Sequence, residues 1–422
     1  MIKYDKYKDS GVDWLGDIPE HWSINRNKNV FREISKLSKN GDETLLTVSH
    51  ITGVTPRSEK NVNMFFAETM EGYKICQEGD LVINTMWAWM GALGTSRYYG
   101  ICSPAYNVYR NINGVDYSHQ YFDYLFRTPN FVVEMTRLSK GIVESRLRLY
   151  PKDFFRIQTA LPSLHEQTAI ATYLDSKTSA IDSKVSLLEQ KITRYQQLRK
   201  SLINETVCRG LDKKVKLKDS EIEWIGEIPE HWGVKRFKSF AQTIKGKNLE
   251  FFDEPFENSL PNLSLEYLRN DEVVFPTYCY SPSKSILVSE NDFIIVWDGA
   301  GVGEILNGKK GYLSSTIAKI VVNPKLVYPK YLFHLRDNIE YTLKQIPAGM
   351  GIPHLNPFVL NNFPCPSPPM DEQVAIANFL DEKTQKIDSI VSNIKTQIET
   401  LKELRKTLIN DVVTGKIKVI NH

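Results

Sequence analysis

The sequence has few cysteines, and they lie far apart. Five occur in 422 residues, and no two form a C-x-x-C pair. Disulfide-stapled domains and zinc modules both depend on closely spaced cysteines, so the spacing argues against both classes. The eight histidines are also scattered, without the spacing of a metal-ligand set. The five cysteines are Cys76, Cys102, Cys208, Cys279 and Cys365.

Long apolar runs are missing as well. No stretch approaches the ~20 apolar residues that span a bilayer, and the first residues lack the apolar core of a signal peptide. Hydrophobic residues make up 41% of the chain and charged residues 24%, as in ordinary soluble proteins. We therefore expect a cytoplasmic protein that does not enter a membrane.

The chain also lacks a large excess of either charge, since its net charge is only +3. Residues 1–163 carry 20 Lys and Arg against 18 Asp and Glu, and residues 216–365 carry 16 against 18. Bulk charge therefore does not identify a nucleic-acid binder. A DNA-binding surface would require basic groups to gather on one face.

The common catalytic signatures are absent too, including the P-loop, H-E-x-x-H and G-x-S-x-G. One glycine-rich stretch, Asp298–Gly303, follows an expected strand at 292–297 and invites a nucleotide or S-adenosylmethionine interpretation. Its spacing is G-x-G-x-G, however, and no clear helix follows. Asn356-Pro357-Phe358 lacks the second proline of the adenine methyltransferase motif. We favour a turn at 298–303 and predict no catalytic site, keeping a methyltransferase or nuclease that uses this loop as the enzyme alternative.

The sequence contains a heptad pattern typical of a long helix, and this pattern is repeated. Apolar residues recur at steps of three and four through 166–207 and again, 206 positions later, through 372–413. Such a seam is buried against another such seam, so we predict that the two copies pair; packing on a globular neighbour or on a second chain is the alternative. Arg199 and Arg405 occupy the one charged slot. The other seam residues are Leu174, Thr178, Ile181, Val185, Leu188, Ile192, Tyr195 and Leu202, repeated as Leu380, Thr384, Ile387, Val391, Ile394, Ile398, Leu401 and Leu408.

A second repeat precedes each helix. The segment 10–22, with Trp14 and Trp22, recurs at 220–232 with Trp224 and Trp232. We call each copy the box. Its glycine and proline predict a turn and its tryptophans predict burial, whereas its His-Trp pair also suggests a ligand or base-stacking site. Because acids flank both copies, we favour packing.

Between box and helix lies a variable module in each half. Short β-rich runs at 44–51, 80–84 and 105–109, followed by helical spacing over His119–Leu138, predict a mixed α/β module. The second module has the same layout, with a helix expected over Val327–Tyr341. Residues 138–150 and 343–355 are glycine-hinged turns in corresponding positions. Ser163 and Glu166 predict a capping box at the start of the first long helix.

Aromatic and basic residues gather in loops of both modules and are candidates for DNA contacts. Lys and Arg contact phosphates, Arg also binds guanine, and aromatic rings contact sugars or thymine methyls. For any single residue, a solvated charge or a packed ring is the competing interpretation. The DNA-binding candidates are Trp87, Trp89, Arg97, Tyr98, Tyr99, Tyr106, Arg146 and Arg148 in the first module, and Lys245, Lys247, Tyr278, Tyr280, Lys284, Trp297, Lys309, Lys310 and His354 in the second.

These motifs together resemble a known family. Glu-Gln-x-Ala-Ile-Ala-x-aromatic-Leu-Asp at 166–175 and 372–381, the Trp-x-Gly-x-Ile-Pro-x-x-Trp boxes, and Ser-Pro-Ala-Tyr at 103–106 are similar to the specificity subunits of bacterial type I restriction–modification systems. The resemblance covers essentially the whole chain. It implies an α+β fold: two α/β target recognition domains joined by two long helices that form an antiparallel coiled coil with a pseudo-twofold internal repeat. The expected division is 1–162, 163–208, 209–365 and 366–415.

The resemblance also implies function and partners. Each recognition domain would read one half of a bipartite double-stranded DNA target, while the coiled coil sets the spacing and docks two methyltransferase subunits. Those partners would bind S-adenosylmethionine, restriction subunits would complete the complex, and this chain would hold no cofactor and catalyse nothing. A 166–207 helix is ~60 Å long at ~1.5 Å per residue, comparable to ~18 base pairs at ~3.4 Å each. A coiled-coil scaffold whose modules bind proteins is the non-DNA alternative.

Overall fold

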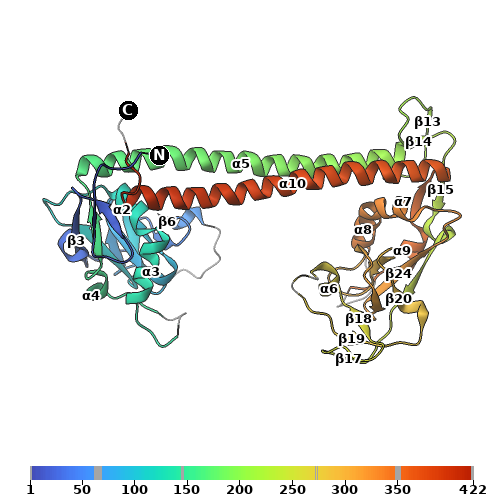
Figure 1. Ribbon diagram of the computed structural model, residues 1–422, viewed down its shortest axis with the longest axis horizontal. Helices are drawn as coiled ribbons and strands as arrows, with labels where there is room; N and C mark the ends of the chain where they lie inside the picture. The colour runs from blue at the N-terminus through green and yellow to red at the C-terminus, as the bar shows by residue number, and fades with distance from the viewer. Residues whose placement is uncertain are drawn as a thin grey trace. The chain divides into compact units, whose positions relative to one another are not determined.

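The structure is a computed structural model and describes residues 2–60, 69–143, 147–270, 272, 274–346 and 353–419. It forms two compact units, the first made of residues 1–189 and 395–422 and the second of residues 190–394. Two long helices contribute to both units, α5 (Leu164–Arg209) and α10 (Met370–Val413). Each unit therefore contains one box, one module and a stretch of both long helices (Figure 1).

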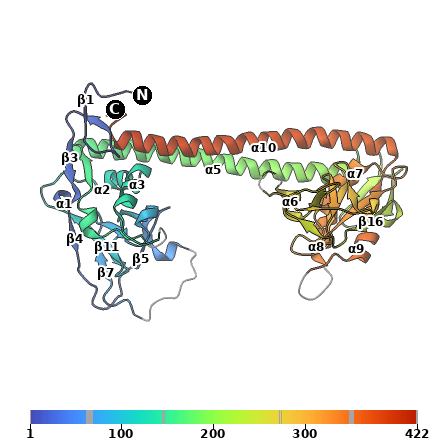
Figure 2. The same cartoon turned by 60° about the horizontal axis from the view of Figure 1, so that its bottom comes forward.

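Within each unit the two helices run side by side in opposite directions (Figures 1 and 2). In the first unit Arg405 of α10 donates to Asp182 of α5 over 3.3 Å. In the second unit Arg199 of α5 donates to Asp388 of α10 over 3.1 Å. The two pairs are related by the 206-residue offset of the repeat. The charged slots in the seam are thus ion pairs to the opposite helix, and the predicted pairing of the two copies is confirmed in each unit.

The seam residues lie between the helices as predicted. Leu174 and Leu380 are fully buried, and Thr178, Ile394 and Ile398 are at most 5% exposed. The remaining seam positions are buried or half-buried, while most residues between them are exposed. Burial of this apolar stripe is the main stabilising contribution to helices of this length.

The first unit is built on an antiparallel four-stranded sheet in the order β4-β11-β8-β9, namely Phe31–Ile34, Tyr106–Asn111, Leu81–Asn84 and Leu93–Thr95. Two-stranded pairs surround it: β1 (Tyr7–Asp9) with β2 (Asp17–Pro19), β3 (Ser23–Arg26) with β12 (Gln158–Leu161), β5 (Leu46–Ser49) with β6 (Gly53–Pro56), and β7 (Lys74–Cys76) with β10 (Gly100–Cys102). Its helices are α1 (Asn27–Val30), α2 (His119–Phe126), α3 (Pro129–Leu138) and α4 (Pro151–Phe154), with short 3-10 turns η1 (Arg57–Glu59) and η2 (Ala88–Met90).

The second unit repeats this plan. Its four-stranded sheet has the order β16-β24-β21-β22, namely Ala241–Lys245, Ile317–Val322, Phe293–Val296 and Ile305–Asn307. The pairs β13 (Leu217–Asp219) with β14 (Glu227–Pro229) and β15 (Gly233–Arg236) with β25 (Pro364–Ser367) match β1–β2 and β3–β12. The helices are α6 (Leu265–Arg269), α7 (Pro329–His334), α8 (Arg336–Gln345) and α9 (Pro357–Asn362), with 3-10 turns η4 (Phe237–Ser239) and η5 (Lys284–Ile286).

The units differ in their second layer of strands. The second unit has a five-stranded sheet, β17-β19-β18-β23-β20, where the first unit has the separate pairs β5–β6 and β7–β10. Shared topology in the main sheet and divergence elsewhere agree with modules that share a layout but few side chains. The five strands are Phe251–Phe252, Tyr278–Cys279, Leu260–Leu263, Gly311–Leu313 and Leu287–Val288.

The helical structure predicted over His119–Leu138 and Val327–Tyr341 is confirmed, but each stretch is two helices rather than one. The stretch His119–Leu138 is two helices, because Pro129 has no N–H to continue α2 and the Thr128 side chain instead caps α3 by accepting from the Phe131 amide. The stretch Val327–Tyr341 begins two residues late, at a proline, and is likewise divided into α7 and α8. The chain after 138–150 enters the short helix α4 before the strand β12.

The boxes are packing elements, as favoured from sequence. Trp22 and Trp232 are at most 1% exposed. Tyr7, beside the first box, donates its hydroxyl to the carbonyl of Gly415, just past the end of α10 (3.1 Å), and the amide of Lys418 donates to the carbonyl of Ile2 (2.9 Å). The end of the last helix therefore lies near the first box. Figure 2 shows the end of α10 beside the start of α5.

The repeated Glu-Gln dipeptide explains how each helix holds its box and module. Glu166 accepts hydrogen bonds from Tyr4 and His21, while Glu372 accepts them from His231 and Trp232. The Glu166 amide donates to Ser163 as predicted (3.3 Å), but its carboxylate faces the box, so the reciprocal half of the expected capping box is replaced.

The neighbouring glutamine is buried in both units. The Gln167 side chain accepts from the Ser118 amide (2.8 Å) and donates to the carbonyl of Pro162 (2.9 Å). The Gln373 side chain does the same with the Tyr328 amide (2.8 Å) and Pro368 (2.9 Å). Each glutamine thus joins the start of its long helix to the loop that leads into the first module helix.

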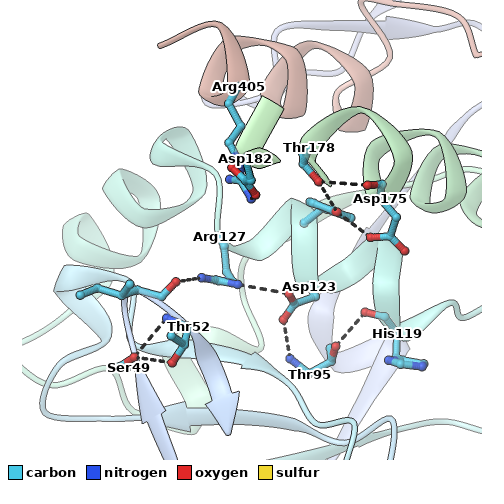
Figure 3. Close-up of polar contacts among 12 residues, drawn as sticks. Ser49, Thr52, Thr95, His119, Asp123, Arg127, Asp175, Thr178, Asp182 and Arg405 are labelled. Carbon is cyan, nitrogen blue, oxygen red and sulfur yellow. Dashed lines mark hydrogen bonds and ion pairs between the residues drawn. The ribbon is translucent and has the colours of Figure 1, made fainter. Parts of the chain in front are cut away.

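In the first unit, α2 lies between α5 and the β-strands and forms hydrogen bonds with both (Figure 3). Tyr124 donates to Asp175 of α5 (2.6 Å), and burial followed by this hydrogen bond raises the pKa of Tyr124 to about 12. On the other side of α2, Asp123 accepts from the Thr95 amide (2.9 Å), while Arg127 donates to the carbonyl of Ile51 in the β5–β6 turn. The module is fixed to α5 through side chains rather than by a flexible linker.

Candidate nucleic-acid interface

The same edge of the main sheet gathers candidate residues in both units. In the first unit the amide of Leu149 donates to the carbonyl of Thr85, just after β8 (3.2 Å). In the second unit the amide of Leu355 donates to the carbonyl of Trp297, just after β21 (2.7 Å). The segment returning to the long helix thus pairs with the end of a central strand in each unit. The two predicted glycine-hinged turns occupy equivalent places, as far as the described residues reach.

In the first unit this edge carries apolar and basic side chains. Trp87 is 52% exposed, and the flanking Met86 and Met90 are each 38% exposed. Trp89 is half-buried and donates its Nε1–H to the carbonyl of Met86 (3.1 Å). Arg148 is exposed one residue before the bond that joins the return segment to β8. Candidate Arg146 lies outside the described residues. This edge therefore presents Trp87 and Arg148 together.

Other first-module candidates lie elsewhere. Arg97, Tyr98 and Tyr99 are exposed in the connection between β9 and β10. Tyr106, at the start of β11, is half-buried against the cluster that contains Leu46, and burial raises its pKa. For Tyr106 the packing interpretation is the better one.

In the second unit the edge carries charged side chains. Asp298 accepts from Lys245 of β16 (2.9 Å) and from Nδ1 of His354 (2.6 Å). The Lys245 ammonium also lies 5.6 Å from the centre of the Trp297 ring, within reach of a cation–π contact. Three predicted residues, Lys245, Trp297 and His354, therefore meet around Asp298, an acid of the expected turn that was not among the DNA-binding candidates.

The remaining second-module candidates are dispersed. Lys309 donates to the carbonyl of Tyr267 (2.9 Å) and lies over its ring, so it has an intramolecular role. Tyr280 is 51% exposed, whereas Tyr278 on β19 is half-buried. The other three candidates are exposed lysines: Lys247, Lys284 and Lys310.

The glycine-rich stretch at 298–303 is a hairpin connection, as favoured from sequence. It joins β21 to β22, and no helix opens at its end. The amides of Asp298, Gly299, Val302 and Gly303 donate to carbonyls of the protein, so four of the six amides in this stretch are used internally and not held ready for a phosphate. Asn356 accepts from the amides of Phe358 and Val359 and is the N-cap of α9.

Few other chemical centres are present among the described residues. No group of three or more His, Cys, Asp or Glu is placed there to hold a metal ion. No described helix is long and apolar enough to cross a membrane. The five cysteines are free and buried, and burial raises the pKa of the Cys102 thiol to about 12, which keeps it protonated and unreactive.

Comparisons with known proteins agree with this architecture. Residues 229–400 match the family model of the type I restriction modification DNA specificity domain. The type I restriction enzyme MjaVIII specificity subunit of Methanocaldococcus jannaschii is 37% identical over 188 residues, which are 44% of this chain and 43% of that protein. The putative MjaX specificity subunit of the same organism is 24% identical over 62% of this chain and 60% of its own length. The chain thus spans about half the length of these relatives.

Solved structures share the fold along nearly the whole chain. A chain from a structure on complex assembly and conformational transition of the type I R-M system has a TM-score of 0.74 at 16% identity, covering 95% of this chain and 99% of that one. The HsdS subunit from Thermoanaerobacter tengcongensis has a TM-score of 0.59 at 17% identity, covering 95% and 98%. With the duplicated boxes, modules and paired helices, these matches show that the chain is similar to type I restriction–modification specificity subunits, in sequence over part of its length and in fold along nearly all of it.

Proposed function

We propose that this chain is the DNA-recognition subunit of a type I restriction–modification complex. Each unit reads one half of a bipartite duplex target, and the paired helices α5 and α10 fix the gap between the halves. Two methyltransferase subunits dock on the helices, and restriction subunits complete the assembly. The complex would act on DNA in the cytoplasm.

This proposal depends on one observation: the two units share the same main sheet, but the equivalent edge of that sheet carries different side chains in each unit. The main sheets of the two units have the same strand order, and the same edge receives the segment that returns to the long helix. At that edge the first unit presents Trp87 and Arg148, while the second presents Lys245 and His354. Two readers with different chemistry predict an asymmetric target of two parts.

The side chains at this edge suit DNA. Arg and Lys contact phosphates and the O6 and N7 atoms of guanine, and exposed apolar groups contact thymine methyls. A protein-binding scaffold would need a contiguous apolar patch, whereas the second unit presents an ion-paired cluster here. This contrast supports DNA over protein as the partner of the second module.

The attachments of each module support a spacer role for the helices. Gln167 and Gln373 fix the first module helix of each unit to the start of a long helix. Eight residues further along each helix, about two turns, Asp175 bonds Tyr124 in the first unit and Asp381 bonds Lys330 and His334 in the second. A reader bound to its helix at two such points would move with that helix. A fixed helix pair would therefore impose a fixed gap.

Catalysis is assigned to the partners. We expect S-adenosylmethionine to bind the methyltransferase subunits rather than this chain, because the 298–303 turn uses four of its six amides internally. Isothermal titration of the isolated chain with S-adenosylmethionine tests this assignment. One-to-one binding by the isolated chain would favour the enzyme alternative.

The main experiment is selection of bound duplexes from a random DNA library by the chain in complex with its methyltransferase subunits. We expect an enriched motif of two short defined parts separated by a fixed number of undefined base pairs. A library that shows no enrichment, together with a chain that captures proteins through its modules, would support the scaffold alternative.

A further inference from the structure

The second unit contains a polar cluster in which an acid holds two outward-facing donors. Asp298 contacts Lys245 through one carboxylate oxygen (2.9 Å) and His354 through the other (2.6 Å). Both distances are those of charge-assisted hydrogen bonds. The carboxylate side chain is 18% exposed, whereas those of Lys245 and His354 are 42% and 50% exposed. The acid therefore lies behind the two groups that face solvent.

Backbone pairing fixes the cluster in place. Asp298 and His354 form an antiparallel bridge, with the Gly299 amide donating to the carbonyl of Pro353 (2.9 Å) and the Leu355 amide donating to that of Trp297 (2.7 Å). Lys245 is the last residue of β16 and is paired with β24. All three side chains are thus carried on hydrogen-bonded backbone, which pre-organises them for recognition.

The protonation states follow from this geometry. Burial raises the pKa of Asp298, but the hydrogen bonds from His354 and Lys245 outweigh it, and the net pKa is lowered. The ionised carboxylate can only accept, so Nδ1 of His354 carries the proton and donates. In the neutral ring Nε2 is then an acceptor. Lys245 keeps further N–H donors beyond the one directed at Asp298.

From this arrangement we infer that the cluster reads a G·C base pair in the half-site of the second unit. Lys245 donates to O6 and N7 of guanine, and Nε2 of His354 accepts from the N4 amine of the paired cytosine. Asp298 touches no base and is a positioning residue. The inference rests on the proposed function of the chain.

The choice of G·C follows from the groove pattern. Guanine alone offers two adjacent acceptors in the major groove, and the paired cytosine places a donor beside them. A multi-donor ammonium next to a ring acceptor is the complement of that sequence of groups. An A·T pair separates its two acceptors by a donor and adds the thymine methyl, which a charged cluster does not favour.

Among its described residues, the first unit has no such cluster at the corresponding place. Because Thr85 and Trp297 accept equivalent bonds from the return segment, Met86 corresponds to Asp298 and Arg148 to His354. An apolar side chain replaces the acid there. Changes to the cluster should therefore alter one half of the target, and the other half serves as an internal control.

The test uses the full chain in complex with its methyltransferase subunits and selection from random duplexes. Lys245→Met should reduce the preference for G·C at one position of one half-site by roughly 5- to 150-fold, the range for loss of a bidentate base contact. His354→Ala should relax the same position. Lys218→Met, which removes an exposed lysine from β13, should leave the motif unchanged.

Asp298→Asn tests the positioning role. We expect partial relaxation at the same base pair, together with a changed tautomer of His354 in ¹⁵N spectra of histidine-labelled protein, assigned with His354→Ala. A purely structural role would not alter that tautomer. An unchanged midpoint of thermal unfolding and an intact opposite half-site confirm that the variant is folded.

The outcomes separate the two levels of the proposal. A wild-type complex that selects no two-part motif refutes the proposed function. A wild-type complex that selects one, with Lys245→Met leaving every position unchanged, refutes only the G·C inference. The same inference fails if Lys245→Met weakens binding to all duplexes equally and lowers the salt dependence, since that identifies a phosphate contact.

Discussion

Replacement of Gln373 by alanine is the most informative perturbation of the repeated frame. Its side chain is 2% exposed and bonds the Tyr328 amide and the carbonyls of Pro368 and Leu326. Each lost hydrogen bond costs about 1 kcal/mol, and each buried partner left without one costs about 1–3 kcal/mol. Alanine cannot restore any of the three bonds. We therefore expect the free energy of unfolding of the second unit to fall by about 3 kcal/mol.

Hydrogen exchange measured by mass spectrometry localises this effect. Amides of 326–345 and 364–373 should exchange faster in Gln373→Ala, while those of 116–138 in the first unit should keep their rates. The equivalent substitution Gln167→Ala should give the reverse pattern. Gln196→Ala, at an exposed position of α5, should change neither the exchange rates nor the free energy of unfolding by more than about 0.5 kcal/mol.

Two results would refute this reasoning. A loss below about 1 kcal/mol would mean that water or a rearranged loop replaces the glutamine without cost. Faster exchange in both units after the single substitution would mean that the glutamine supports the whole chain rather than the attachment of one module to one helix.

Three further predictions concern single side chains. Gly415→Ala should destabilise the chain more than Gly16→Ala. Both glycines have a positive φ (+78° and +65°), but a Cβ at 415 collides with Pro19 while one at 16 meets open space. Differential scanning calorimetry compares the two unfolding midpoints, and equal decreases would show that Pro19 moves aside without cost. Asp381→Asn should be less stable than wild type at neutral pH, and the difference in free energy of unfolding between the two proteins should become smaller at low pH. Burial raises the pKa of Asp381, but bonds from its lysine and histidine partners lower it below 3.8, so the stabilisation is present above that pH and is lost as the pH falls through the lowered pKa; a constant gap between pH 2 and 7 would exclude this pairing. Trp87→Ala should leave thermal stability unchanged, since the ring is 52% exposed, and should relax only the half-site opposite to that of Lys245→Met in library selection; altered preference in both half-sites would contradict separate readers.

Much of the frame is predictable from sequence because it depends on periodic or repeated residues. The heptad seam predicts which residues face inward, and the two boxes predict buried tryptophans. The sequence also marks Arg199 and Arg405 as exceptions in the seam. It cannot supply their partners, since Asp388 and Asp182 become neighbours only once the antiparallel register is fixed.

The modules were less predictable for physical reasons. The signal that divides the helix at Pro129 was present in the sequence, but the apolar spacing continues through it. Strands of two or three residues such as β17 carry no alternation to detect. Asp298 bears no local mark of a role, since its importance arises from contacts to Lys245 and His354, which lie 53 and 56 residues away in the sequence.

The most direct test of the account lengthens both long helices by four residues each and repeats the library selection with the methyltransferase complex. Four residues add ~6 Å to a helix at ~1.5 Å per residue, close to two base-pair steps of ~3.4 Å. We expect both half-site sequences to stay as in wild type while the undefined gap between them becomes longer. Changed half-site sequences with an unchanged gap would contradict the division of this chain into two readers and one spacer.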